Sequence, residues 1–325
     1  MKNRTVKEIG GYLELDRYGQ NMLHEDAAAL NCGRNCLAYL IRAKRIKRIA
    51  LPLFMCSSVR EICLREGVEI RHYCIDEKFR PTDVTLSDGE WLYLVNYYGQ
   101  LPAEDIGGYQ KKYKRIIVDN AQAYFDSPLS DVDTLYTCRK FFGVADGAFL
   151  YTDSALDCEL EQDESYGRME FILGRYERTA SEFYGLYVKN NELFDTEPIK
   201  RMSPLTLNLL HGIDYGSVKE KRTQNYRYLY KRLECVNELQ LRKIEGAFAY
   251  PLLLKHGAEV RKKLIQERIY IPMLWPNVLD DAEQGSMEYR YAEHILPLPC
   301  DQRYGEAEMR RICELVCRLA MKGDK

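Results

Sequence analysis

The sequence has no apolar run long enough to cross a membrane. The longest runs, such as Ile49 to Cys56, hold eight residues, whereas a membrane-spanning helix needs roughly 18 or more. The N-terminal residues Met1 to Glu8 are polar, and no apolar stretch follows them that would act as a signal peptide. We therefore expect a cytoplasmic protein with no membrane partner.

Paired cysteines and clustered histidines are also missing. The chain has 11 cysteines, an odd number without a CxxC pair, and only 5 histidines, which are dispersed. This pattern is typical of neither a disulfide framework nor a zinc site, so we expect reduced thiols and no bound metal. Cys32 and Cys36, like Cys313 and Cys317, are four residues apart on predicted helices. We favour buried core positions for these thiols over pairing.

Several common site motifs are absent. The sequence has no GxGxxG after a strand, no GxxxxGK[ST] and no GxSxG, and His24-Glu25 lacks the second histidine of a zinc-protease helix. With 47 basic and 49 acidic residues, the net charge of −2 gives no broad attraction for nucleic acid. A small molecule is therefore the expected partner.

What the sequence does contain is an alternation of helical and strand patterns. Apolar residues with a helical period run from Asn35 to Lys47, and short apolar strands follow at Arg48 to Phe54 and, later, at Arg115 to Asp119. Strands that alternate with helices favour right-handed crossovers and a mostly parallel sheet that is covered on both faces. The sequence predicts an α/β fold whose large domain has three α/β/α layers.

The second half of the chain has a different pattern. Residues from about 155 to 235 are mainly helical, and we assign residues 1–235, including this segment, to the large domain. Residues 236–325 are assigned to a smaller C-terminal α+β domain. The elements expected in this half are a long helical pattern over Leu205 to Tyr230, strands over Gly246 to Leu254 and Ile269 to Trp275, and a terminal helix over Gly305 to Met321.

The first candidate site segment is Cys32-Gly33-Arg34-Asn35, at the start of a predicted helix. A glycine allows close approach of the backbone, and the free N–H groups of a helix N-terminus suit a phosphate, to which Arg34 adds positive charge. A glycine before a helix is also common in an ordinary turn. This segment alone does not separate the two interpretations.

The second segment, Val118-Asp119-Asn120-Ala121-Gln122, places a carboxylate at the carboxyl end of a buried strand. Ligands bind at this edge in open α/β sheets, and a buried carboxylate needs a partner because an unpaired buried charge costs several kcal/mol. A protonated pyridine nitrogen is a suitable partner for Asp119, and Gln122 can donate to a phenolic oxygen on the same ring. The alternative is that Asp119 caps a helix.

The third segment is Thr137-Cys138-Arg139-Lys140, just past a predicted strand. A lysine amine can form a covalent bond with a carbonyl cofactor, although most lysines are simply solvated. Lys140 follows Asp119 by 21 residues, on the next strand end. This position favours the functional interpretation.

Together these segments resemble the fold-type I pyridoxal-phosphate (PLP) enzymes, and most closely the DegT/StrS sugar aminotransferases. In that family a glycine-led helix start binds the phosphate, a D-x-x-Q pair contacts the ring, and a lysine binds the cofactor covalently. The run from Arg201 to Leu205 is similar to the family's R-M-S-x-L helix entry, and Leu296 to Pro299 to its late L-P segment. The resemblance implies phosphate contacts from Gly33, Arg34, Asn35 and Thr137, ring contacts from Asp119 and Gln122, and catalysis by Lys140.

The chain departs from the family pattern at three places. The serine that usually precedes the lysine is absent, so its role passes to Thr137. The aromatic residue that stacks on the cofactor ring aligns with Cys56, with Phe54 as the alternative after a small shift. The asparagine that reaches the phosphate of the partner subunit falls at about Ile199, a loss for which Arg34 compensates.

The resemblance implies a PLP-dependent aminotransferase of nucleotide-sugar biosynthesis that works as a homodimer. The amino group would pass from an amino acid such as glutamate to a keto-sugar nucleotide or a similar small keto substrate. Two alternatives stay open. One is a degenerate PLP-binding member with a regulatory or binding role, and the other is a PLP-dependent dehydratase, against which Lys140 argues because those relatives carry histidine there.

Overall fold

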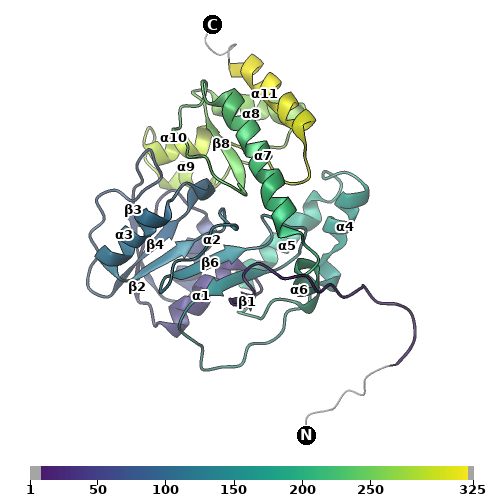
Figure 1. Ribbon diagram of the computed structural model, residues 1–325. Helices are drawn as coiled ribbons and strands as arrows, with labels where there is room; N and C mark the ends of the chain where they lie inside the picture. The colour runs from purple at the N-terminus through teal and green to yellow at the C-terminus, as the bar shows by residue number, and fades with distance from the viewer. Residues whose placement is uncertain (1–8, 321–325) are drawn as a thin grey trace.

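The computed structural model describes residues 9–320 and is built on a seven-stranded sheet (Figure 1). The strand order is β1-β7-β6-β5-β4-β2-β3; the five strands from β6 to β3 run parallel, and β1 and β7 are joined antiparallel at one edge. The mostly parallel sheet expected from the sequence is confirmed. The strands are β1 (Ala28–Leu30), β2 (Arg48–Pro52), β3 (Glu69–Tyr73), β4 (Glu90–Val95), β5 (Ile116–Asp119), β6 (Asp133–Thr137) and β7 (Ala148–Tyr151).

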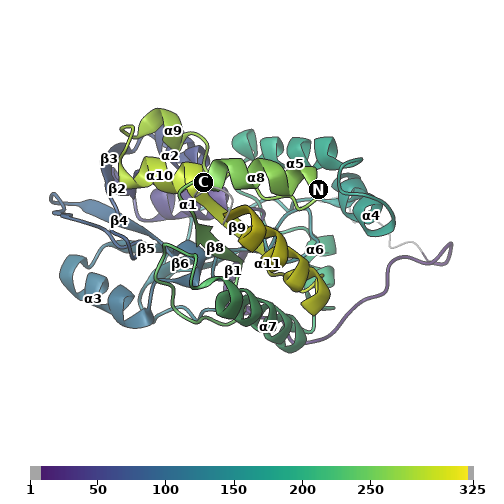
Figure 2. The same ribbon diagram turned by 90° about the horizontal axis from the view of Figure 1, so that it is seen from above.

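The central strands are mostly apolar, with charged residues at their ends, because both faces of the sheet are covered. In β5, for example, Ile117 and Val118 point to opposite faces and are both fully buried. Figure 2 shows α1 (Gly33–Ala43) and α2 (Ser57–Arg65) on one side of the sheet and α3 (Ala103–Tyr113) on the other, so the sheet is the middle of three layers.

The long helical pattern of the middle region is interrupted. It divides into α6 (Pro204–Leu210) and α7 (Tyr215–Leu233), and each helix begins at a side-chain cap. Ser203 accepts a hydrogen bond from the Thr206 backbone N–H, and Asp214 does the same for Ser217. The R-M-S-x-L run thus starts a helix. Two further helices precede these, α4 (Glu170–Glu177) and α5 (Tyr184–Thr196).

A second, two-stranded sheet follows in the chain. β8 (Ala249–Leu253) pairs antiparallel with β9 (Ile295–Pro299), and the late L-P segment forms β9. Its core includes Tyr226 of α7 together with Leu252, Leu264, Leu298 and Val316. The helices of this part are α8 (Gly257–Gln266), α9 (Val278–Asp281), α10 (Met287–His294) and α11 (Glu306–Ala320).

The strand expected over Ile269 to Trp275 is wrong. These residues form an irregular segment without strand pairing. Pro272 has no N–H to offer a neighbouring strand, and Trp275 has a φ of 63°, which extended strands do not allow. The Trp275 ring instead packs edge-on against Phe54, with 4.7 Å between ring centroids. Aromatic packing, rather than strand pairing, holds this segment to the body of the protein.

All 11 cysteines are free. Cys32, Cys36 and Cys313 are buried, as expected for core thiols, whereas Cys317 is only partly buried. No helix in residues 9–320 has the length and apolar character to cross a membrane. The polar segment Met1 to Glu8 and the end of the predicted terminal helix at Met321 lie outside the described residues.

The start of α8 depends on a close backbone approach. A Cβ atom on Gly257 would lie 2.0 Å from the backbone oxygen of His294, at the end of α10. We expect Gly257→Ala to push these helices apart and to lower the Tm of the protein by several degrees in calorimetry. Gly108→Ala, on the open face of α3 with nothing within 4 Å of the added atom, should raise the Tm slightly, since alanine is the better helix former. Equal effects of the two changes would contradict the close approach.

Candidate active site

The three segments predicted from the sequence meet at the carboxyl edge of the large sheet. Asp119 ends β5, Thr137 ends the neighbouring parallel strand β6, and α1 begins at Gly33. A Cβ atom on Gly33 would lie 3.9 Å from Thr137 Cβ, so the N-terminus of α1 lies against the end of β6. Parallel pairing is what brings residues so far apart in the sequence to one edge.

Asp119 is a partly buried carboxylate held in a fixed orientation. The Tyr93 hydroxyl donates to Oδ2 at 2.9 Å, and the Ala121 backbone N–H donates to Oδ1 at 2.8 Å. Burial raises the pKa of Asp119, and the charge of Lys140, the Ala121 N–H and the Tyr93 hydroxyl each oppose that rise. Turns rather than a helix follow β5, so the helix-cap alternative for Asp119 is excluded.

Gln122 is buried beside this carboxylate, and the oxygen of its side-chain amide binds the backbone. Its Oε1 accepts a hydrogen bond from the Tyr98 N–H at 2.8 Å, at a residue with a φ of 53°. The Nε2 group makes no hydrogen bond to another described residue. A donor is therefore left for a ligand.

Lys140 lies on the turn after β6 and is exposed. Its Nζ is 5.7 Å from the centroid of the Phe248 ring. The positive charge of Lys140 acts to lower the pKa of Asp119. The next peptide is held from two other parts of the chain, because Phe141 O accepts from Arg222 Nη2 at 3.1 Å and from Gln302 Nε2 at 2.8 Å. The lysine side chain is thus free while its backbone is fixed.

No sequence motif pointed to Arg222, which lies on α7. Its side chain is 1% exposed, its guanidinium lies 4.6 Å from the Phe141 ring centroid, and it also donates to Ala247 O at 2.9 Å. Burial lowers the pKa of this arginine. Arg222 therefore ties the turn that carries Lys140 to the start of the second sheet.

The predicted phosphate residues lie at the N-terminus of α1, but two of their side chains have other partners. Arg34 forms an ion pair with Asp195 at 2.7 Å. The Asn35 amide is fully buried and donates to Asn31 Oδ1 at 3.0 Å and to Pro198 O at 2.8 Å. Contacts of Asn35 with an anion would therefore come from its backbone N–H.

Cys56 and Phe54 differ in their exposure. Phe54 is 1% exposed, and its ring packs against Tyr97, with 5.4 Å between centroids. Cys56 immediately precedes α2, is partly exposed, and its Sγ lies 3.1 Å from the Ser58 hydroxyl that donates to it. Of the two, only Cys56 has surface left for a ligand.

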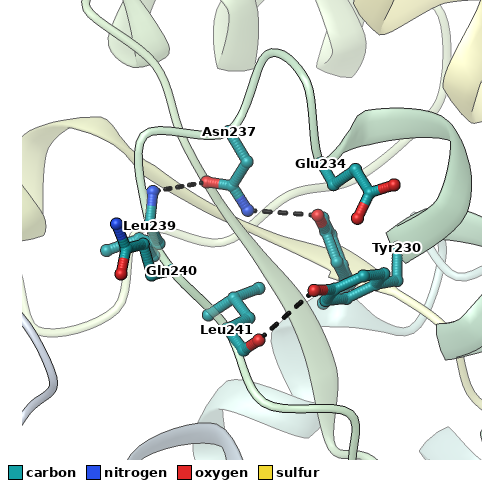
Figure 3. A pocket seen from close by; sticks show the side chains of 7 residues that line it. Tyr230, Glu234, Asn237, Leu239, Gln240 and Leu241 are labelled. Carbon is teal, nitrogen blue, oxygen red and sulfur yellow. Dashed lines mark hydrogen bonds between the residues drawn. The ribbon is translucent and has the colours of Figure 1, made fainter.

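The second sheet has a cavity of its own, with a volume of 260 Å³ (Figure 3). Its walls include Tyr230, Asn237 and Tyr250, and Asn237 Nδ2 donates to the Tyr250 hydroxyl at 3.1 Å. None of the predicted site residues lines this cavity. No group of three or more metal-ligating side chains occurs within the part of the chain that the structure describes.

Comparison with known proteins identifies the fold. No protein-family model and no curated protein sequence matches the chain. Solved structures do match over most of its length. A DegT DnrJ EryC1 StrS aminotransferase from Brucella abortus is 12% identical with a TM-score of 0.62, and the match covers 90% of this chain and 86% of that one.

Two further structures are equally similar. Spr1654 from Streptococcus pneumoniae, in its PLP form, is 14% identical with a TM-score of 0.63, covering 92% of this chain and 88% of that one. DesI, solved in the presence of its TDP-sugar product, is 14% identical with a TM-score of 0.62, covering 91% and 81%. The chain therefore has the fold of these aminotransferases, and the fold-type I architecture expected from the motifs is confirmed.

Removal of Arg222 should loosen the turn that carries Lys140. We expect Arg222→Met to lower the Tm by several degrees, because Ala247 O loses its guanidinium donor and Phe141 O keeps only Gln302. The loss of a buried hydrogen bond of this kind costs about 1–3 kcal/mol. The control is Arg227→Met, on the exposed face of the same helix, with a side chain that is 62% exposed. Calorimetry of both variants tests this, and an unchanged Tm for Arg222→Met would contradict it.

Proposed function

We propose that the protein is a PLP-dependent aminotransferase with Lys140 as its catalytic residue. The observation that carries this proposal is the position of Lys140 and Asp119 at the carboxyl ends of neighbouring parallel strands, close enough for the lysine charge to lower the pKa of the carboxyl. A pyridine aldehyde needs two such groups. The lysine amine binds the aldehyde carbon, and the carboxylate pairs with the protonated ring nitrogen.

The residues present fit the cofactor in two respects. Asp119 is a partly buried carboxyl whose pKa is raised by burial, so a protonated ring nitrogen would supply the positive partner it lacks. The N-terminus of α1 has no side-chain cap and no acidic residue in its first turn, which leaves its N–H groups for a phosphate.

Each residue then has a defined task. Asp119 keeps the proton on the ring nitrogen, while Tyr93 and Ala121 hold the carboxylate in place. Gln122 donates from Nε2 to the ring oxygen, Cys56 lies against the ring, and Thr137 joins Gly33 and its neighbours at the phosphate. Lys140 binds the cofactor covalently and later moves the proton at the substrate carbon. When bound, the cofactor supplies the electron sink.

The proposed reaction transfers an amino group from an amino acid such as glutamate to a keto-sugar nucleotide. The similarity in fold to DesI, which was solved with a TDP-sugar product, supports the acceptor class. We further propose a cytoplasmic homodimer. We also propose a boundary between two domains near residue 235, supported by the second core that β8, β9, α8 and α11 form with the end of α7.

Covalent capture tests the cofactor and the lysine together. We expect purified protein mixed with PLP to gain a visible absorption band, and borohydride reduction followed by peptide mass mapping to find the pyridoxyl adduct on Lys140. Lys140→Ala should give no adduct, and Lys140→Arg should abolish transamination. An adduct on another lysine, or full transamination by Lys140→Arg, would disprove the assignment.

Glutamate separates the alternatives left by the sequence. Conversion of the bound cofactor to its amino form by glutamate is the expected result for an aminotransferase. A protein that binds PLP on Lys140 but shows no half-reaction with any amino acid would instead be the degenerate binding member.

The ionised form of Asp119 should lower the stability of the cofactor-free protein. Because its pKa is raised in the folded state, the folded protein loses stability as the pH rises through that pKa. We expect cofactor-free Asp119→Asn to have a higher Tm than the unmodified protein at pH 7, with the difference vanishing below about pH 3.9, where the unfolded carboxyl is protonated.

The same variant should bind PLP weakly, since a neutral amide does not hold the ring proton. Asp126→Asn is the matched control, because burial also raises the pKa of Asp126 but none of the ring or phosphate contacts involves it. Calorimetric scans across pH and PLP titrations of both variants provide the measurements. A fall in the Tm of Asp119→Asn at pH 7 would contradict the cost assigned to the buried charge.

A further inference from the structure

Arg139, the residue before Lys140, is a partly buried cation whose neighbours are an amide, an aromatic ring and two other arginines. Its guanidinium donates to Asn191 Oδ1 and lies 4.8 Å from the centroid of the Phe194 ring, both on α5. The nearest groups of fixed charge include Arg34 and Arg168, which carry the same sign. Burial and these like charges lower the pKa of Arg139.

The two neighbouring arginines are neutralised, whereas Arg139 is not. Arg34 pairs with Asp195 at 2.7 Å, and Arg168 pairs with Asp163 at 2.7 Å. Among the ion pairs of residues 9–320, none includes Arg139. A positive charge held out of water without a counter-ion is costly, so this guanidinium is suited to receive an anion.

The position of Arg139 says where that anion would lie. The guanidinium is near Cys32, which precedes α1, and its charge lowers the pKa of that thiol against the larger effect of burial. The first turn of α1 has N–H groups without a side-chain cap, and Thr137 comes two residues before Arg139 at the strand end that touches Gly33. Arg139 and Arg34, which is in the first turn of α1, both donate to Asn191, so the unpaired cation lies near the helix N-terminus.

We infer that Arg139 is the side chain that binds the phosphate group of the cofactor, in place of Arg34. The inference rests on the proposed function and deepens it. The charge of Arg34 is already neutralised by the ion pair with Asp195. The planar guanidinium of Arg139 can donate two parallel hydrogen bonds to a phosphate. Arg139 then supplies within one chain the contact that the residue near Ile199 does not offer.

The test compares ligands with and without the phosphate. We expect Arg139→Met to weaken PLP binding by about 10- to 100-fold, as for the loss of a charge-assisted hydrogen bond, and to leave the affinity for pyridoxal unchanged. Arg139→Lys should recover only part of the loss, because an ammonium lacks the fork. Arg168→Met is the control, since Arg168 contacts the same Phe194 ring, at 5.3 Å, but is paired.

Inorganic phosphate provides a second measurement that does not need the cofactor. Millimolar phosphate should raise the Tm of the unmodified protein and of Arg168→Met, but not that of Arg139→Met. If the Lys140 adduct forms while Arg139→Met binds PLP normally, the inference is overturned and the proposed function stands. If no adduct forms but phosphate stabilises the protein through Arg139, the proposed function fails, and Arg139 is an anion site but not the phosphate contact of the cofactor. Equal loss of PLP and pyridoxal binding in Arg139→Met would mean a structural role and also overturn the inference.

Discussion

The carboxyl edge of the parallel sheet holds a partly buried acid, and the rest of the site is arranged around it. Asp119 is kept at the end of β5 by the Tyr93 hydroxyl and the Ala121 N–H, in surroundings that raise its pKa. Its strongest source of positive charge is Lys140, on the turn after the neighbouring strand. If β5 and β6 did not pair in parallel, these two residues would not share an edge.

That edge also explains why the two sheets belong together functionally. Lys140 is exposed, but the peptide beside it is held by Arg222 from α7 and by Gln302 from the segment before α11. Arg222 also binds Ala247 O, next to the second sheet. A movement of the second sheet relative to the first would therefore shift the backbone next to the lysine.

Sequence patterns were sufficient where the physical cause was local. The apolar runs of the central strands and the strand ends that carry Asp119 and Lys140 follow from neighbouring residues. The helical pattern over Leu205 to Tyr230 was predicted, but the break at which Asp214 caps α7 was not. Sequence patterns failed where a distant contact decided the outcome. The segment ending at Trp275 is not a strand, because the indole packs on Phe54. Except for Asn31, the partners of Arg34 and Asn35 named above are more than 150 positions away, so the motif did not show where these side chains point.

The charges at this edge form a pattern that a single ligand can satisfy. Within residues 9–320, Asp119 at one end has no ion pair and only the more distant charge of Lys140, and at the other Arg139 has no ion pair near the N-terminus of α1. Each of these two charges lowers the stability of the protein without a ligand, because a buried charge without a counter-charge is disfavoured. A molecule with a protonated ring nitrogen at one end and a phosphate at the other relieves both costs in one binding event, and a free phosphate relieves only the second. Under the proposed function, the relief of both groups would add to the affinity for the whole cofactor rather than for either of its parts.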